Sequence, residues 1–135
     1  MANIIEINDL SIDDLAVYTR MTDAQMRSKL EPEKGIFIAE SVNVIQYALD
    51  AGCKPISLLM EKKHIENKAK SIIEQCGDVP VYTASSEVLQ QLTGFALTRG
   101  ILCAMHRPAQ KTLQEAIADA KRVAVLEGIV DTTNM

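Results

Sequence analysis

Residues 92–100, "LTGFALTRG", form the segment of this sequence best suited to chemistry. The segment lies between a helical pattern and an apolar run. Thr93 precedes its first glycine, and Thr98 and Arg99 precede its second. Hydroxyl groups, backbone amides and a guanidinium suit contacts with phosphate and ribose groups. We therefore predict a binding loop here. The alternative is an ordinary surface loop in which Arg99 pairs with an acidic side chain.

A second candidate is Glu40, in the segment "FIAES" at residues 37–41. The apolar run before it predicts a buried strand, so Glu40 would lie where that strand ends and the next helix begins. In open α/β sheets, ligands bind along the rim where the strands end. The alternative is that the carboxylate only interacts with the dipole of the helix N-terminus.

Several basic residues are secondary candidates for the same surface. Arg107 follows an apolar run, and the sequence leaves open whether it shares a rim with Arg99. Arg20 and Arg27 belong to a loose basic group near the start of the chain. A further cluster, "EKKH" at residues 61–64, puts lysines near a predicted helix start, where they oppose the helix dipole. A solvated basic face remains the alternative for each of these groups.

The composition limits what such a surface could bind. The net charge of −4 argues against indiscriminate binding of polyanions, although it leaves a local basic face possible. No apolar run is long enough for a membrane span, and the acidic N-terminus has no signal-peptide pattern, so we expect a cytoplasmic protein. Cys53, Cys76 and Cys103 form no CxxC pair, which predicts reduced thiols and no metal site.

Secondary structure must position these candidate residues. In this sequence, apolar runs alternate with helical patterns that are apolar on one side. Two short helices are expected before residue 35, the second starting at a capping box, Thr22–Gln25. The alternation after that point predicts a three-layer α/β/α domain with a largely parallel sheet. The expected core strands are 36–39, 56–60, 80–82 and 101–105, and a further strand is expected at 123–126.

A polar, proline-containing stretch at residues 108–111 marks a domain boundary. Residues 1–108 are then a binding domain, of which 1–17 form an N-terminal arm. Residues 109–121 are a connector helix that begins at the capping box Thr112–Glu115. Residues 122–135 would be the first strand and loop of a truncated second domain.

Three segments, "GIFIAESVNVIQYALDAG", "VPVYTASSEVLQQLTGFALTRGILCAMHRP" and "VAVLEGIVDTTNM", resemble in order and spacing the SpoU-type RNA 2′-O-ribose methyltransferases of the SPOUT superfamily. The resemblance covers about residues 18–135. Asn134 takes the position of the Asn in that family's first catalytic motif, whose Arg would follow Met135. Two residues depart from the family pattern: Ser41, where a Gly is more frequent, and Thr98, where relatives tend to carry His.

The resemblance implies a small α/β domain, similar to an RNA-binding ribosomal-protein fold, ahead of a knotted catalytic domain that binds S-adenosylmethionine (AdoMet). It implies an RNA substrate, rRNA or tRNA, and a homodimer for the complete enzyme. The chain alone is expected to be inactive and to bind no AdoMet, because the knot lies outside it. The alternative is a self-sufficient α/β module that binds a small ligand or a protein, favoured by the acidic balance and the five aromatic residues.

Overall fold

The computed structural model describes residues 3–19, 35–109, 111–125 and 127–128. The predicted capping box at residues 22–25 and three site candidates, Arg20, Arg27 and Asn134, lie outside the described residues. In chain order the elements are β1 (Asn3–Glu6), the 3-10 helix η1 (Asp13–Tyr18), β2 (Ile36–Glu40), α2 (Val42–Asp50), β3 (Lys54–Glu61), the 3-10 helix η2 (Lys62–His64), α3 (Lys70–Cys76), β4 (Pro80–Ala84), α4 (Ser86–Thr93), β5 (Ile101–His106) and α5 (Leu113–Ile117).

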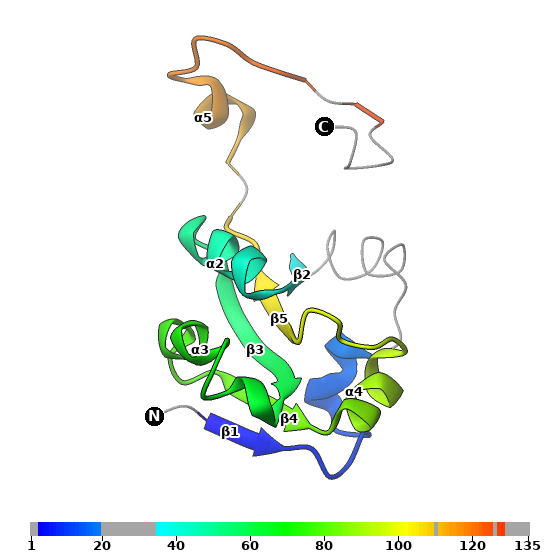
Figure 1. Cartoon of the computed structure of the whole chain (residues 1–135). Coiled ribbons are helices and arrows are strands. Elements are labelled where there is room, and N and C mark those ends of the chain that lie inside the picture. Colours follow the sequence, from blue (N-terminus) through cyan, green and yellow to red (C-terminus); the bar gives the residue numbers. More distant parts are fainter. Residues whose placement is uncertain (1–2, 20–34, 110, 126, 129–135) are drawn as a thin grey trace.

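A five-stranded sheet in the order β1-β4-β3-β5-β2 forms the centre of the fold (Figure 1). The four predicted core strands are confirmed as β2, β3, β4 and β5. The sheet is mixed rather than largely parallel, because β5 runs antiparallel to both of its neighbours, β3 and β2. Apolar runs identify buried strands but carry no information about direction. Here residues 94–100 return the chain to the rim where β4 ended, which reverses β5.

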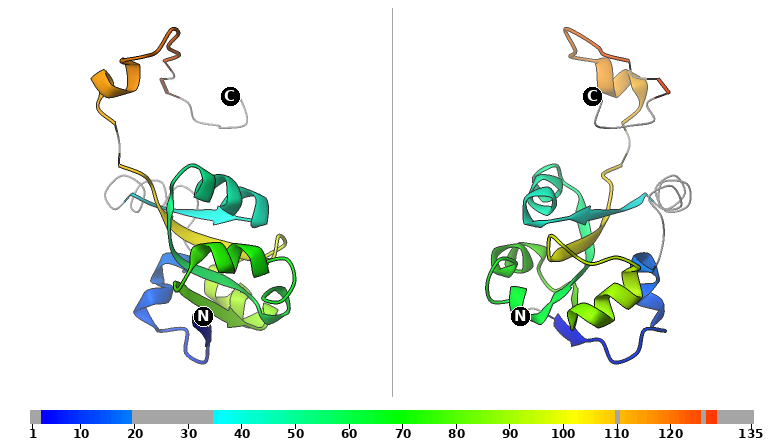
Figure 2. Two further views of the ribbon diagram at one scale, coloured as in Figure 1. Left: turned by 90° about the vertical axis from the view of Figure 1, so that its left-hand side faces the viewer. Right: turned by 45° about the vertical axis from the view of Figure 1, so that its right-hand side comes forward.

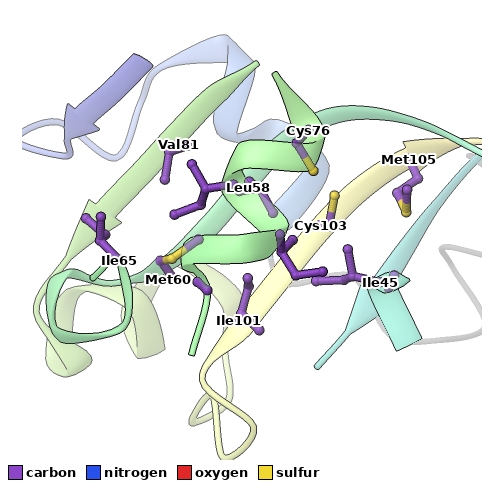
Figure 3. Packing of buried hydrophobic residues seen from close by; sticks show 13 residues of the cluster. Ile45, Leu58, Met60, Ile65, Cys76, Val81, Ile101, Cys103 and Met105 are labelled. Carbon is purple, nitrogen blue, oxygen red and sulfur yellow. The ribbon is translucent and has the colours of Figure 1, made fainter. Parts of the chain in front are cut away.

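Helices cover both faces of the sheet, as the three-layer prediction requires (Figure 2). Alternate side chains of β3 point to opposite faces of the sheet and belong to different core clusters. Leu58 and Met60 belong to the cluster under α2 and α3, whereas Leu59 belongs to the cluster under η1 and α4. In the first cluster the sulfur atoms of Cys76 and Cys103 point toward one another (Figure 3). Both are buried free thiols, as predicted.

The start of the chain is a strand followed by a 3-10 helix, and the second short helix predicted before residue 35 lies outside the described residues. Strand β1 pairs in parallel with β4 at the edge of the sheet, and η1 packs beneath the sheet. The buried side chains Ile7, Leu15 and Tyr18 anchor this segment. Acidic residues between them obscure the apolar pattern in the sequence, but the burial of these three makes residues 3–18 an integral part of the domain.

The end of the described chain confirms one prediction and corrects another. Thr112 and Glu115 form the expected capping box at the start of α5. The predicted strand at 123–126 is not found, because residues 122–125 have no strand structure, and Val123 and Val125 are 61% and 84% exposed. A strand needs a partner for its backbone groups, and the described chain offers none here. Figure 1 shows α5 standing away from the sheet.

Candidate nucleic-acid interface

Strands β1, β2, β3 and β4 all end at one side of the sheet, which is here called the carboxyl rim. Because β5 is antiparallel, its first residue lies at this rim and the loop of residues 94–100 arrives there. Glu40, the last residue of β2, pairs with Leu102 of β5, and the Ser41 amide donates to the Ile101 carbonyl over 3.1 Å. The two strongest sequence candidates, Glu40 and the Arg99 loop, therefore meet at one rim.

Thr93 shapes this loop from inside. The residue is 3% exposed, and its hydroxyl lies 2.9 Å from the Leu89 carbonyl and 2.8 Å from the Phe95 carbonyl. Its side chain is thus occupied by its own segment and does not face solvent. Thr98 and Arg99, by contrast, are exposed. Among the loop's predicted contact residues, these two are the ones whose side chains face solvent.

The far end of the loop is fixed by a close approach that the sequence analysis did not find. A Cβ on Gly100 would lie 2.7 Å from Nε2 of His64, and Gly100 has a φ of +84°. The positive φ favours glycine, and any larger residue would have to displace the imidazole. His64 is buried, and this burial, together with the charges of Lys63 and Lys68, lowers its pKa from the ordinary value. The imidazole of His64 therefore packs against the residue next to Arg99. No sequence pattern distinguishes such a histidine from a surface one.

Ser41 lies beside this contact in a strained conformation. Its φ of 86° falls in the left-handed region, which favours glycine. The side chain also serves as the N-cap of α2, since it accepts from the Val44 amide over 3.4 Å. This conformation gives a physical reason for the glycine that the resembling family has at this position. Backbone strain held at a rim is typical of binding sites.

Arg107 is not brought together with Arg99. The two residues flank β5, so the whole length of the strand Ile101–His106 separates them. The Arg107 amide donates to the Gly35 carbonyl over 2.8 Å, at the side of the sheet where β2 begins. The question left open by the sequence is thereby answered: the two guanidinium groups belong to opposite rims.

The basic segment at residues 61–64 also lies at the carboxyl rim. Lys62–His64 form η2, and α3 begins only at Lys70, so the two lysines do not face the N-terminus of an α-helix. Lys63 forms an ion pair with Glu61 at 2.7 Å. Lys62 is exposed beside it. The helix-dipole argument for a functional role of these lysines therefore does not apply.

The described ranges contain neither a metal-binding cluster nor a membrane-spanning helix. Within them, no three His, Cys, Asp or Glu side chains gather as a metal site requires. No helix in the same ranges has the length and apolar character needed to cross a bilayer.

No protein-family model matches the chain. An uncharacterized tRNA/rRNA methyltransferase of Mycobacterium bovis is 30% identical to it over 133 residues, which are 98% of this chain and 44% of that protein. Proteins of the same name from two strains of Mycobacterium tuberculosis match to the same extent. The chain thus spans less than half the length of these curated relatives.

Two crystal structures of an rRNA methyltransferase from Sinorhizobium meliloti share the fold. The AdoMet-bound structure matches with a TM-score of 0.52 at 18% identity, covering 79% of this chain and 38% of that one. The other matches with a TM-score of 0.51 at 17% identity, covering 80% of this chain and 39% of that one. Together with the curated relatives, they confirm the predicted resemblance to RNA methyltransferases and the mixed α/β fold.

Proposed function

We propose that this chain is the RNA-binding part of an AdoMet-dependent methyltransferase that modifies the ribose 2′-hydroxyl of an rRNA or tRNA. The observation that carries the proposal is the similarity of 98% of the chain to proteins named tRNA/rRNA methyltransferase. The SpoU-type motifs noted in the sequence support the ribose 2′-hydroxyl as the position modified. The meeting of Glu40 with the Arg99 loop at one rim supports binding of RNA there.

The groups at the carboxyl rim suit the RNA backbone better than the base edges. The exposed guanidinium of Arg99 can donate to a phosphate in the bidentate manner that favours arginine at such sites. The Thr98 hydroxyl and the Glu40 carboxylate can bond to 2′-hydroxyl groups, which distinguish RNA from DNA. Thr93, whose hydroxyl is used within the loop, acts as a positioning residue. The contacts read RNA shape more than sequence.

The same proposal places catalysis in a part of the enzyme beyond the described residues. By the family resemblance, Asn134 belongs to the first catalytic motif, and AdoMet binds in a knotted domain of a cytoplasmic homodimer. Two hollows open among the described residues. One has a volume of 290 Å³, and its lining residues include no aromatic or large aliphatic side chain against which adenine could stack. The other, at 170 Å³, is below the roughly 300–1,000 Å³ of ligand pockets.

The test is filter binding of a structured rRNA fragment and of a DNA of the same sequence at several salt concentrations. We expect weak binding that prefers RNA, with a salt dependence of on the order of two to four ion pairs, since the net charge is −4. Calorimetry with AdoMet should show no binding to residues 1–135. Equal binding of RNA and DNA, or micromolar AdoMet affinity, would contradict the proposal.

A further inference from the structure

A hollow at the ends of β3, β4 and β1 is separate from the Arg99 loop and plays no part in the proposal above. It has a volume of 290 Å³. We call it the switch-point hollow, and its lining includes Glu6, Glu61, Lys62, Lys63, Thr83 and Ser85.

The topology of the sheet explains why a hollow opens here. After β3 the chain passes to α3, which packs on the cluster containing Ile72 and Ile73. After the neighbouring strand β4 it passes to α4, which packs on the opposite face through Leu89 and Leu92 (Figure 2). The two connections diverge, so a crevice is left between the ends of these adjacent parallel strands. In open α/β sheets this switch point is where ligands bind.

Thr83 gives this crevice an unexplained polar group. It is 1% exposed, and its register partners are Glu6 on β1 and Met60 on β3. Its hydroxyl is a buried side-chain group for which the described chain offers no hydrogen-bond partner. Leaving a buried hydroxyl unpaired costs stability, and native proteins rarely do so without a reason. A ligand in the hollow that Thr83 lines would supply the partner.

The charges around the hollow define the ligand. Glu61 is already paired with Lys63 at 2.7 Å. Within the described ranges, neither Glu6 nor Lys62 forms an ion pair, so one carboxylate and one ammonium are left for a ligand. A carboxylate at the end of a strand accepts hydrogen bonds from ribose hydroxyls. An ammonium donates to a phosphate. Because the four charges sum to zero, a single phosphate fits better than a triphosphate.

We propose that the switch-point hollow binds a ribose 5′-phosphate unit, with the ribose hydroxyls on Glu6 and Thr83 and the phosphate on Lys62. The base extends into solvent, because the lining residues include no aromatic or large aliphatic side chain to stack on it. The ligand class follows from the hollow itself. Two sources would supply this ligand. One is a nucleotide of a bound RNA, which rests on the proposed function, and the other is a free mononucleotide, which does not.

The experiment is an NMR titration of the amide signals of the ¹⁵N-labelled chain with uridine 5′-monophosphate and with its 2′-deoxy counterpart. We expect millimolar binding of the ribonucleotide that shifts the amides of residues 61–64 and 83–85. The deoxynucleotide should bind at least about fivefold more weakly, because one hydrogen bond to a charged group is lost. A short oligouridylate distinguishes the sources: tighter binding than the monophosphate indicates RNA, and equal binding indicates a free nucleotide.

Two substitutions of the same residue separate binding from folding. Thr83→Val should weaken binding of the ribonucleotide about fivefold and raise the melting temperature, because an unpaired hydroxyl is removed. Thr83→Ser keeps the hydroxyl and should keep the affinity. The absence of shifts at residues 61–64 and 83–85 at millimolar ligand, or equal shifts with both nucleotides, would overturn the inference. If the shifts are absent but RNA still binds in the filter assay, only the inference about this hollow is contradicted. If the shifts appear but RNA does not bind, only the proposed function is contradicted.

Discussion

Two buried hydroxyl groups, one from η1 and one from β4, have opposite surroundings. The Tyr18 hydroxyl donates to the Ser57 carbonyl at 2.8 Å, lies 2.8 Å from the Ser57 hydroxyl and accepts from the Ala104 amide at 3.2 Å. The Thr83 hydroxyl, at the carboxyl rim, has no partner in the described chain. The Tyr18 hydroxyl has its hydrogen-bond partners within the chain, whereas the Thr83 hydroxyl has none among the described residues. The contrast separates the part of the sheet that stabilises the fold from the part that is available for binding.

The Tyr18 hydroxyl forms hydrogen bonds to the sheet where the strand register is irregular. The register between β3 and β5 shifts between Pro55 and Ser57, which disturbs the ladder at this point. The hydroxyl serves as the partner of the Ala104 amide there. Burial raises the pKa of Tyr18 above its ordinary value, so the group stays a neutral donor and acceptor. A hydroxyl from η1 thus ties the start of the chain to the middle of the sheet.

The largest expected effect follows from removing that hydroxyl. Tyr18→Phe removes the hydroxyl that donates to the Ser57 carbonyl and accepts from the Ala104 amide in a buried position. We expect the free energy of unfolding to fall by about 3 kcal/mol, since each unsatisfied buried group costs roughly 1–3 kcal/mol. Urea denaturation followed by circular dichroism measures the change. Tyr47→Phe is the matched control, because Tyr47 is 76% exposed and should change stability little.

The opposite sign is expected at the other hydroxyl. Thr83→Val replaces a buried hydroxyl that has no partner with a methyl group of similar size. The free energy of unfolding should rise by about 1 kcal/mol. The same urea experiment gives the value. A loss of stability would mean that Thr83 already has a partner within the folded chain, and the contrast between the two regions would disappear.

The smallest effect concerns His64, the buried side chain that supports Gly100. Burial lowers its pKa in the folded state below the value of about 6.5 in the unfolded chain. The unfolded state therefore binds a proton more readily, and the contribution of His64 to stability is complete above pH 6.5 and is lost as the pH falls below it. Urea unfolding at pH 8 and pH 5.5 should show this loss. His64→Gln should reduce it, and His106→Gln, at an exposed position, should not.

The sequence predicted much of the fold because four strands are apolar runs bounded by turn residues. Thr112 as the cap of α5 was an equally local signal and is confirmed. Strand β1 was missed because it is only four residues long and mostly exposed. The direction of β5 was missed because it is set by the return of the preceding loop. Both depend on the rest of the chain rather than on a local pattern.

The candidate site was predicted only in part for the same reason. Glu40 and Arg99 carry a local signal, since each sits at a strand end in a segment of unusual composition, and the structure brings them to one rim. The contact of His64 with Gly100 and the unpaired hydroxyl of Thr83 arise between residues far apart in the sequence. Such contacts have no local pattern. Thr93 was predicted as a contact residue because of its hydroxyl, but this hydroxyl is buried and bonds to carbonyl groups of its own segment.

The central claim is that RNA binds at the carboxyl rim, and two arginines at opposite rims test it most directly. Filter binding of the structured rRNA fragment at low salt should be weakened by Arg99→Ala by roughly 1 kcal/mol or more, because a charge-assisted contact is lost. Arg107→Ala removes the same charge from the opposite rim and should have a clearly smaller effect. If both variants bind like the parent, or if Arg107→Ala is the weaker binder, the assignment of the RNA-binding surface is wrong.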